Sequence, residues 1–497
     1  MSYYLIGIGG TGARCMEAFV HLNGAGLLND KQPVKLVYVD ADVSCGNLQR
    51  TQKAVEAYAK VQPMEFGDTG LFANAIDDYA PWSPVPENKK NLDEVLQRSG
   101  LANKNEFQPL GLLYDALFTK EERETSLDKG FRGHPAIGAA VMGSSMNVEE
   151  VEPWRSLMQK INIDKDAKIF LFASVFGGTG ASGFPTIARV LQNLLSKVDT
   201  NGGQSVAKIG GALILPYFTF PPADDGSTTE MQAKVDDFIL NTKSALNYYD
   251  NSDLLEKVFK SIYLIGDNDL TETGNFSLGS NTQKNDAHFI ELYGALAAFD
   301  FFNKTDFSET ETPMVARGSD GSGDTITWED LPDRNEQFRA RIKSYIEFLF
   351  LYQRMIYPQL FGDREIGSEQ GFFTKIFGKK RQAWVENLVI KKGQIDLSDN
   401  TSWKNFDDLK DYADTFFLWL KQVCNNNRRD IQLIDKHIFD ENNKFDDNMD
   451  IIIPKNETAK ALSRTAITGE LSAEKKKSVS LTGTGYLMSA IYDIVER

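Results

Sequence analysis

The amino-acid sequence predicts an α/β protein, in which a parallel sheet has helices on both faces and is followed by a mainly helical C-terminal region. Short β-rich runs alternate with helical runs from residue 3 to residue 302, as in sheets whose crossover connections are helices. Glycine-rich turns stand where predicted strands run into predicted helices. Beyond residue 335 the strand pattern stops and helical patterns take over.

The elements follow from local patterns in the chain. Predicted strands cover Tyr3–Ile8, 34–40, 168–175, 209–215 and Ser261–Ile265, and helices are expected over 12–28, 181–195 and 230–249. Residues 286–302 are apolar almost all round, which is expected of a helix in the core of a large domain. We place one domain over 1–309, with an insertion at about 51–129, and a mainly helical second domain over 310–497.

The composition indicates a soluble globular chain and argues against several partners. The net charge is −16 and the isoelectric point is about 4.9, so the surface should repel nucleic acid and anionic membranes. No uncharged run is long enough to span a bilayer. Three cysteines without metal spacing and four scattered histidines fit a cytoplasmic protein without a zinc site or disulfide framework.

The first two motifs lie near the N-terminus. GIGGTGARCMEAF, at 7–19, is a glycine turn that lets backbone N–H groups approach a phosphate at a helix start. A dinucleotide-binding turn or a purely structural turn would explain it as well. LVYVDADVSCGNL, at 36–48, puts Asp40 and Asp42 at the end of the second strand, where α/β folds place ligand contacts. These carboxylates can face a ribose or a phosphate-bound Mg²⁺, or cap the next helix.

Two further glycine-rich motifs follow. In KGFRGHPAIGAAV, at 129–141, two glycines flank Arg132, and a backbone nest beside an arginine suits an anionic group. ASVFGGTGASGFPTIARVL, at 173–191, follows an apolar strand and lacks the lysine of a Walker loop. A simple dinucleotide domain needs only one phosphate loop, so a second one calls for another explanation.

Taken in order, these motifs resemble the GTPase domain of tubulin and FtsZ. The family loop GGGTG[ST]G is similar to FGGTGASG at 176–183, and GAGANPEVG to GFRGHPAIG at 130–138. The family's first loop matches 9–12, its NTDAQAL loosely matches 40–44, and its strand with a lysine-proline-phenylalanine turn resembles ALILPYFTF at 212–220. The chain looks like a divergent prokaryotic tubulin-like protein.

The resemblance implies a bound guanine nucleotide, GTP or GDP, with Mg²⁺. IGDNDL at 265–270 is similar to the context of the family asparagine that contacts guanine, which nominates Asn268. Asn285 and Asp286 resemble the start of the FtsZ central helix, whose aspartate reads the base. A carboxylate suits the N1–H and N2–H₂ edge of guanine because both groups are donors. The alternative for this pair is a helix N-cap. The candidate nucleotide-binding residues are Gly9, Gly10, Thr11, Gly12, Asp42, Arg132, Gly133, His134, Gly177, Gly178, Thr179, Gly180, Ala181, Asn268, Asn285 and Asp286.

The chain after the predicted central helix carries candidate catalytic acids. NKTDFSE at 303–309 resembles the family's catalytic loop, which puts Asp306 and Glu309 on its two acids. In the family these acids reach into the nucleotide pocket of the next subunit and orient the attacking water. Such an acid would position water against the γ-phosphate while Mg²⁺ offsets charge. A solvated acidic loop is the plain alternative.

Several departures from the family pattern accompany the resemblance. Phe176 replaces the first glycine of the main loop, and Arg132 replaces a glycine of the earlier loop. Residues 335–497 have no clear match to the family's second domain, which helps to build filament contacts. These departures bear more on polymerisation than on nucleotide binding.

Three functions therefore stay open. The first is a GTP-binding protein that self-assembles as a homo-oligomer or filament and hydrolyses GTP across the subunit interface. The second is a nucleotide-binding scaffold that does not polymerise and recruits a protein partner through its helical C-terminal region. The third is an adenylating enzyme of the ubiquitin-activating kind, or another Rossmann enzyme, with Asp40, Asp42, Asn47 and Arg50 binding ATP and magnesium. The third leaves the loops at 130–138 and 177–183 unexplained.

Overall fold

The structure is a computed structural model of the whole chain. It describes residues 2–103, 108–127, 130–131, 133–145, 150–164, 166–200, 207–219, 235–252, 254–272, 285–308, 314–315, 325–333, 337–368, 382–397, 399–440, 449–453, 462–473 and 482–496. The chain packs as two compact units. Unit 1 consists of Met1–Phe19, Gln32–Gln52 and Ile76–Arg317, and unit 2 of Val20–Lys31, Lys53–Ala75 and Gly318–Arg497.

Unit 1 is built on a seven-stranded sheet in which every neighbouring pair is parallel. Across the sheet the strands are β3 (Ile76–Asp78), β2 (Val34–Val39), β1 (Tyr3–Ile8), β4 (Lys168–Ser174), β5 (Lys208–Ile214), β7 (Ser261–Ile265) and β9 (Met314–Val315). The order runs outward from β1 on one side and outward from β4 on the other. The topological switch point of the sheet therefore lies between β1 and β4.

Both faces of this sheet are buried, which explains why its strands read as almost continuous apolar runs. All residues of β1, β2 and β4 are buried. The register pairs Leu5 of β1 with Leu36 of β2 and with Phe170 of β4. Because side chains alternate along a strand, Leu5 and Ile6 face opposite sides of the sheet and each side needs its own helices.

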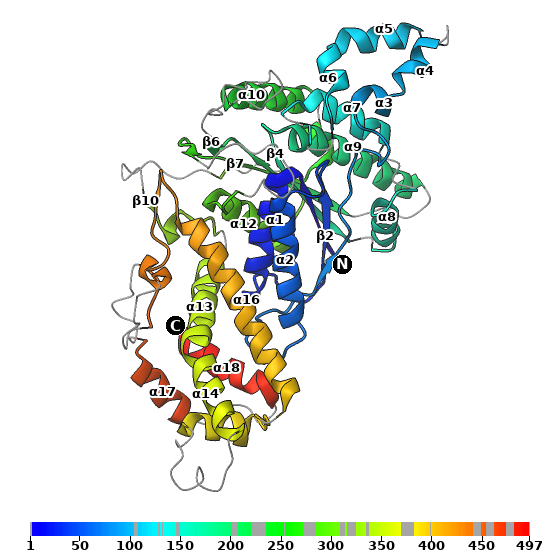
Figure 1. Cartoon of the computed structure of the whole chain (residues 1–497). Coiled ribbons are helices and arrows are strands. Elements are labelled where there is room, and N and C mark those ends of the chain that lie inside the picture. Colours follow the sequence, from blue (N-terminus) through cyan, green and yellow to red (C-terminus); the bar gives the residue numbers. More distant parts are fainter. Residues whose placement is uncertain are drawn as a thin grey trace. The chain divides into compact units, whose positions relative to one another are not determined.

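Helices cover the sheet on both sides, as predicted (Figure 1). On one side Ile6, Ile8 and Leu171 form a core with residues of α7 (Pro135–Ser145), α8 (Trp154–Ile163) and α9 (Gly178–Thr200). On the other side, Phe170 lies 5.5 Å, between ring centroids, from Phe301 of α12 (Phe289–Asn303). Phe19 of α1 (Gly9–Asn23) stacks on Phe299 at 4.3 Å.

Helix α12 is the core helix that the sequence predicts. Every residue of α12 except Asp300 and Asn303 is buried. It begins at Phe289 and not at residue 286, and this difference matters for the residues at its start.

The remaining elements of unit 1 are further helices and a second, two-stranded sheet. They are α3 (Leu92–Val95), α4 (Arg98–Asn103), α5 (Gln108–Leu117), α6 (Lys120–Glu124), α10 (Val235–Asn251), α11 (Leu254–Val258) and a small parallel pair, β6 (Phe218–Thr219) with β8 (Thr271–Glu272). Helix α2 (Gly46–Val61) runs through the start of the predicted insertion. The rest of that insertion carries β3 and α3–α6.

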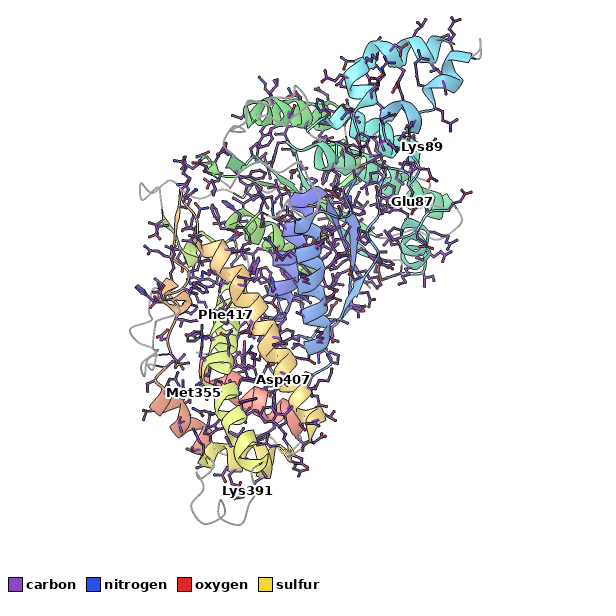
Figure 2. The ribbon with its side chains drawn as sticks, in the orientation of Figure 1. Glu87, Lys89, Met355, Lys391, Asp407 and Phe417 are labelled. Atoms are coloured by element: carbon purple, nitrogen blue, oxygen red, sulfur yellow. The ribbon has the colours of Figure 1, made fainter. Side chains whose placement is uncertain are left out.

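Unit 2 is mainly helical, as predicted. Its elements are β10 (Thr325–Ile326), a 3₁₀ turn (Trp328–Asp330), α13 (Phe338–Leu351), a π-helical turn (Tyr352–Ile356), α14 (Tyr357–Ser368), a π-helical segment (Val385–Lys392), α16 (Asn400–Cys424), β11 (Asp430–Ile431), a 3₁₀ turn (Lys436–Phe439), α17 (Arg464–Ala473) and α18 (Gly483–Val495). Its core is aromatic: the Tyr345 hydroxyl donates to the Tyr412 hydroxyl at 2.8 Å. Met355 and Phe417, labelled in Figure 2, are buried in unit 2.

Within the described part of the chain, no helix combines the length and the apolar character that crossing a membrane requires.

Candidate functional site

Two glycine-led helices start side by side at the switch point of the sheet. Helix α1 begins at Gly9, directly after β1, and α9 begins at Gly178, shortly after β4. Because β1 and β4 are parallel neighbours, both helix N-termini lie at the same edge of the sheet. Open α/β sheets bind ligands at this place. Helix N-termini supply unpaired N–H groups and a positive dipole end, which favour an anion.

Three of the sequence motifs meet at this edge. Gly9 has φ +73°, and a Cβ built on it would lie 3.4 Å from Thr179 Cβ and 3.5 Å from Gly180 N. A Cβ on Gly178 would lie 2.8 Å from Phe131 Cβ, closer than real Cβ atoms approach, and 3.1 Å from Gly133 N, a tight contact. The loops that begin α1, α9 and α7 therefore pack closely at Gly9 and Gly178, and at Gly178 a side chain would not fit without a shift.

Phe176, the residue that departs from the family's glycine pattern, is 3% exposed. Its ring lies 4.9 Å from the ring of Phe238 and 5.6 Å from that of Phe218, between centroids. The phenylalanine thus packs into an aromatic cluster beneath the loop. Gly178 and Gly180, which follow Phe176 in the chain, lie in the first turn of α9.

The two carboxylates after β2 differ in their surroundings. Asp40 is buried, and its Oδ1 accepts a hydrogen bond from the backbone N–H of Asp42 at 3.1 Å. Burial raises the pKa of Asp40 to about 7, and the charge of Asp42 adds to this rise. Asp42 Oδ1 accepts from the backbone N–H of Ser44 at 3.1 Å and from its hydroxyl at 2.7 Å. Asp42 thereby closes the turn that leads into α2.

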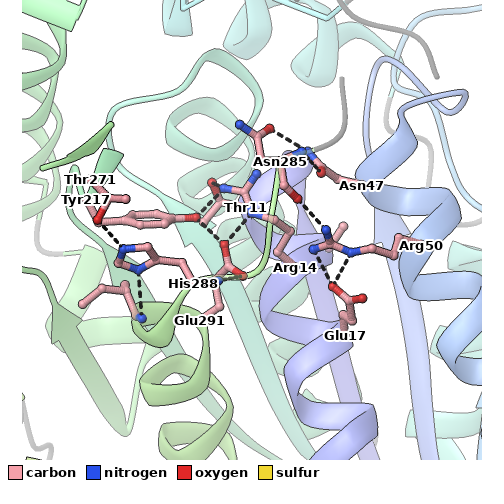
Figure 3. A network of polar contacts seen from close by, with 12 residues as sticks. Thr11, Arg14, Glu17, Asn47, Arg50, Tyr217, Thr271, Asn285, His288 and Glu291 are labelled. Carbon is pink, nitrogen blue, oxygen red and sulfur yellow. Dashed lines mark hydrogen bonds and ion pairs between the residues drawn. The ribbon is translucent and has the colours of Figure 1, made fainter. Parts of the chain in front are cut away.

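Asn285 is held by α2, in contacts that Figure 3 shows. Asn47 Nδ2 donates to Asn285 Oδ1 at 3.3 Å, and Asn285 N donates back to Asn47 Oδ1 at 2.9 Å. Arg50 Nη1 donates to the Asn285 carbonyl at 2.5 Å, and its Nε donates to Glu17 Oε2 at 2.8 Å. A Cβ on Gly10 would lie 3.5 Å from Asn47 Nδ2, so Asn47 joins the first glycine loop to Asn285.

A second buried network joins α1 to α12 (Figure 3). Arg14 Nε donates to Glu291 Oε1 at 2.5 Å, and Arg14 Nη2 donates to the Tyr217 hydroxyl. That hydroxyl donates to Glu291 Oε1 at 2.8 Å. Burial lowers the pKa of Arg14, but Tyr217 and Glu291 together raise it by more, so the guanidinium stays charged inside unit 1.

His288 is the N-cap of α12, which corrects the alternative interpretation of Asn285 and Asp286 as the capping pair. His288 Nδ1 accepts from Ile290 N at 3.2 Å, and Nε2 lies 2.7 Å from Thr271 Oγ1. Since Nδ1 accepts, Nε2 carries the proton and donates to Thr271. Burial, and then the charge of Arg14, lower the pKa of His288 to about 3. Asp286 is exposed, just outside the cap.

The other predicted residues fall in different places. Asn268 is exposed in the bend after β7 and, within the described residues, shares no contact with the network around Asn285. His134 is half-buried, with Nδ1 3.7 Å from Glu122 Oε1. Arg132 and Glu309 lie outside the described residues. Gly12, Thr11, Thr179 and Ala181 are buried at the starts of α1 and α9.

Asp306 lies near the N-terminal ends of the strands, opposite to the end at which the glycine loops lie. It is exposed beyond the C-terminus of α12, and a hydrogen bond from the Ser308 N–H at 2.8 Å keeps its pKa below the usual range. Lys168, the first residue of β4, binds the carbonyls at that end of α12. The glycine loop instead follows Ser174, the last residue of β4. At about 3.3 Å rise per residue, the two ends of β4 are roughly 20 Å apart.

The sequence reasoning missed Arg14, Glu17, Tyr217, Thr271, His288 and Glu291, and it considered Asn47 and Arg50 only for an adenylating enzyme. One available signal was a charged residue within an apolar helix. Glu291 stands in a helix that is otherwise buried almost all round, and an acid in such a place needs a cationic partner. Arg14, in the helix after the first glycine loop, is that partner.

Comparisons with known proteins find only weak similarity, and only to solved structures. Neither a protein-family description nor a curated protein sequence matches the chain. Among solved structures, CetZ from Methanosaeta thermophila strain DSM 6194 is similar at 13% identity and a TM-score of 0.25, over 61% of this chain and 51% of that protein. CetZ2 from Haloferax volcanii, a GTPγS-bound protofilament, is similar at 16% identity and a TM-score of 0.28, over 62% and 60%. The chain spans about half to three fifths of the length of these proteins, and neither likeness identifies what it binds.

Proposed function

We propose that this chain is a tubulin-like guanine-nucleotide-binding protein that hydrolyses GTP when two copies associate. The observation that carries the proposal is the meeting of two glycine-led helix N-termini at the switch point between β1 and β4, with a third glycine loop against them. A single dinucleotide turn would need only the first of these loops. Three converging loops suit the several phosphates of a nucleoside triphosphate.

The phosphate end of the site would be held by backbone groups. The N–H groups at the starts of α1 and α9 would be the donors, and the missing side chains at Gly9 and Gly178 let the three loops pack closely at this place. Within the described residues, no group of three His, Cys, Asp or Glu side chains is arranged to hold a metal. In our proposal, Mg²⁺ would be held by the phosphates together with Asp42, the carboxylate after β2 that we assign to it. Bound there, Mg²⁺ would offset phosphate charge.

The base end of the site would be read from the segment before α12. Asp286 is exposed between Asn285, which α2 holds, and His288, which caps the helix. A carboxylate in this place would accept hydrogen bonds from guanine N1–H and N2–H₂. Adenine offers no such pair of donors, so this arrangement supports GTP over ATP. Asn268 stays a predicted second contact.

Self-association is supported by the distance, within one chain, between Asp306 and the glycine loop that begins α9. Asp306 lies beyond the start of β4, whereas the glycine loop follows its end, so about 20 Å of strand separates them in one chain. An acid that positions water must be within hydrogen-bond reach of it. Asp306 can therefore serve a glycine-loop site only in a second copy of the chain.

The test has two arms. Nucleotide released from purified protein should be guanine nucleotide; adenine nucleotide would overturn the proposal. GTP turnover per molecule should rise with protein concentration, and Asp306→Ala should abolish that rise while the affinity for GTP stays unchanged. Turnover that is independent of concentration, together with normal GTP binding, would instead favour the non-assembling scaffold.

A further inference from the structure

Lys168 is a buried lysine outside the glycine-loop site. It is 6% exposed at the first position of β4. Its Nζ donates to the carbonyl of Phe302 at 2.6 Å and to that of Lys304 at 2.7 Å. The last carbonyls of a helix have no partner within the helix, and a cation is favoured beside them. Lys168 therefore ties the C-terminal end of α12 to the sheet.

The chain that follows α12 is anchored by the same lysine. Lys168 Nζ lies 5.5 Å from the centroid of the Phe307 ring, and Lys304 Nζ lies 5.4 Å from it. The Phe307 ring also lies 5.4 Å from that of Phe301 in α12. Cation–π and aromatic contacts of this kind favour one placement of the ring. Residues 304–308 are thus held at Lys304 by a hydrogen bond and at Phe307 by its ring.

Asp306 stands between these two anchors. Its carboxylate is exposed, accepts from the Ser308 N–H and has a lowered pKa, with the charge of Lys304 a lesser cause of the lowering. The carboxylate is therefore ionised and presented outward from a loop whose backbone is fixed on either side. Lys168 is a buried cation that ties this loop to the sheet.

We propose that Lys168 is a positioning residue for Asp306, which holds the acidic loop in the geometry that a second copy of the chain needs at its nucleotide site. This inference rests on the proposed function. Without the lysine, the carbonyls of Phe302 and Lys304 lose the hydrogen bonds from Lys168, and the Phe307 ring loses a cation. Asp306 would then sample several positions, although nothing at the glycine loops changes.

The experiment compares Lys168→Met, Lys168→Arg and Asp306→Ala with the wild type. Lys168→Met should lower concentration-dependent GTP turnover about 10- to 100-fold, the size of loss that a misplaced reacting group causes. The KM for GTP and the affinity of the dilute protein for GTP should stay within a factor of about three of wild type, a margin small beside that loss. Lys168→Arg should restore part of the turnover, because arginine keeps the charge and the donors.

Two further variants separate positioning from loss of fold. Lys208 of β5 is the register partner of Lys168 on the neighbouring strand. Lys208→Met should leave turnover at the wild-type level. Phe307→Ala removes the anchored ring and changes no residue of the sheet. Its turnover should fall as in Lys168→Met. If both Lys168→Met and Phe307→Ala keep full turnover while Asp306→Ala loses it, Lys168 does not position the acid. If Asp306→Ala itself keeps full turnover, the proposed function fails instead.

Discussion

Arg14 and Glu291 stand 277 residues apart in the chain, yet the Arg14 Nε donates to Glu291 Oε1 at 2.5 Å inside unit 1. Their side chains are 3% and 1% exposed. The pair joins α1, which starts at the first glycine loop, to α12, which starts beside Asp286. This buried charge pair thus helps to hold the helix after the first glycine loop beside the helix that follows Asp286.

Removing one member of this pair should destabilise unit 1 strongly. Arg14→Met leaves Glu291 buried without its cation, and we expect a loss of about 3–5 kcal/mol in the free energy of unfolding. The double variant Arg14→Met with Glu291→Leu should lose clearly less than the two single losses added together, because no charge is left unpaired. Urea unfolding of the three variants measures this coupling.

The exposed pair Arg155–Glu152 is the control, and Arg155→Met should change the stability by less than about 1 kcal/mol. Strictly additive losses at Arg14 and Glu291 would contradict the prediction.

The sequence was informative where structure is encoded locally. Apolar runs such as Tyr3–Ile8 and glycine turns at strand ends predict the parallel sheet and the loops at its edge, because both patterns reflect burial and backbone geometry within a few residues. The Arg14–Glu291 pair could not be predicted in this way, since nothing near Arg14 specifies a partner on α12. The start of α12 was misplaced for a related reason: His288 is not among the preferred N-cap residues, and it caps because Thr271 holds its ring.

A methyl group at Gly178 should weaken phosphate binding. Its Cβ would lie 2.8 Å from Phe131 Cβ and 3.1 Å from Gly133 N, so Gly178→Ala must push apart the loops before α9 and α7. We expect the affinity for GTP to fall at least about tenfold, which corresponds to roughly 1.4 kcal/mol. Gly143→Ala is the matched control, because a Cβ at Gly143 of α7 meets no atom within 4 Å. Fluorescent GTP titrations give both affinities, and equal values for the two variants would argue against close packing of these loops on the ligand.

The base preference should depend on Asp286. Hydrogen bonds to a charged group contribute about 1.5–3 kcal/mol each, so Asp286→Ala, which removes two of them, should weaken GTP binding at least about 100-fold. ITP lacks the 2-amino group, so the wild type should prefer GTP over ITP and the variant should lose most of that preference. Asn47→Ala, which removes an anchor of Asn285, should weaken GTP binding less than Asp286→Ala does.

Competition binding with GTP, ITP and ATP measures the ratios of the three nucleotide affinities. Asp250→Ala, an exposed aspartate on α10, should change none of them. A retained GTP-over-ITP preference in Asp286→Ala would place the reading of the base elsewhere.

Acid should destabilise unit 1 through His288. The folded pKa of His288 is about 3, below its ordinary value of 6.5, so the native imidazole stays neutral where the unfolded one takes up a proton. The stability that His288 contributes is therefore complete above pH 6.5 and is lost as the pH falls toward 3. At pH 5 this amounts to a loss of roughly 2 kcal/mol.

His288→Asn tests this, because asparagine can still cap α12 and has no proton to take up. The stability advantage of the wild type over His288→Asn should shrink by about 2 kcal/mol between pH 7.5 and pH 5 in urea unfolding. His437 is the control of opposite sign. It is exposed, and its hydrogen bond with Asp440 raises its pKa, so any advantage over His437→Asn should grow as the pH falls. If the advantage over His288→Asn is the same at both pH values, burial does not hold His288 neutral, and the capping geometry at the start of α12 needs a different protonation state.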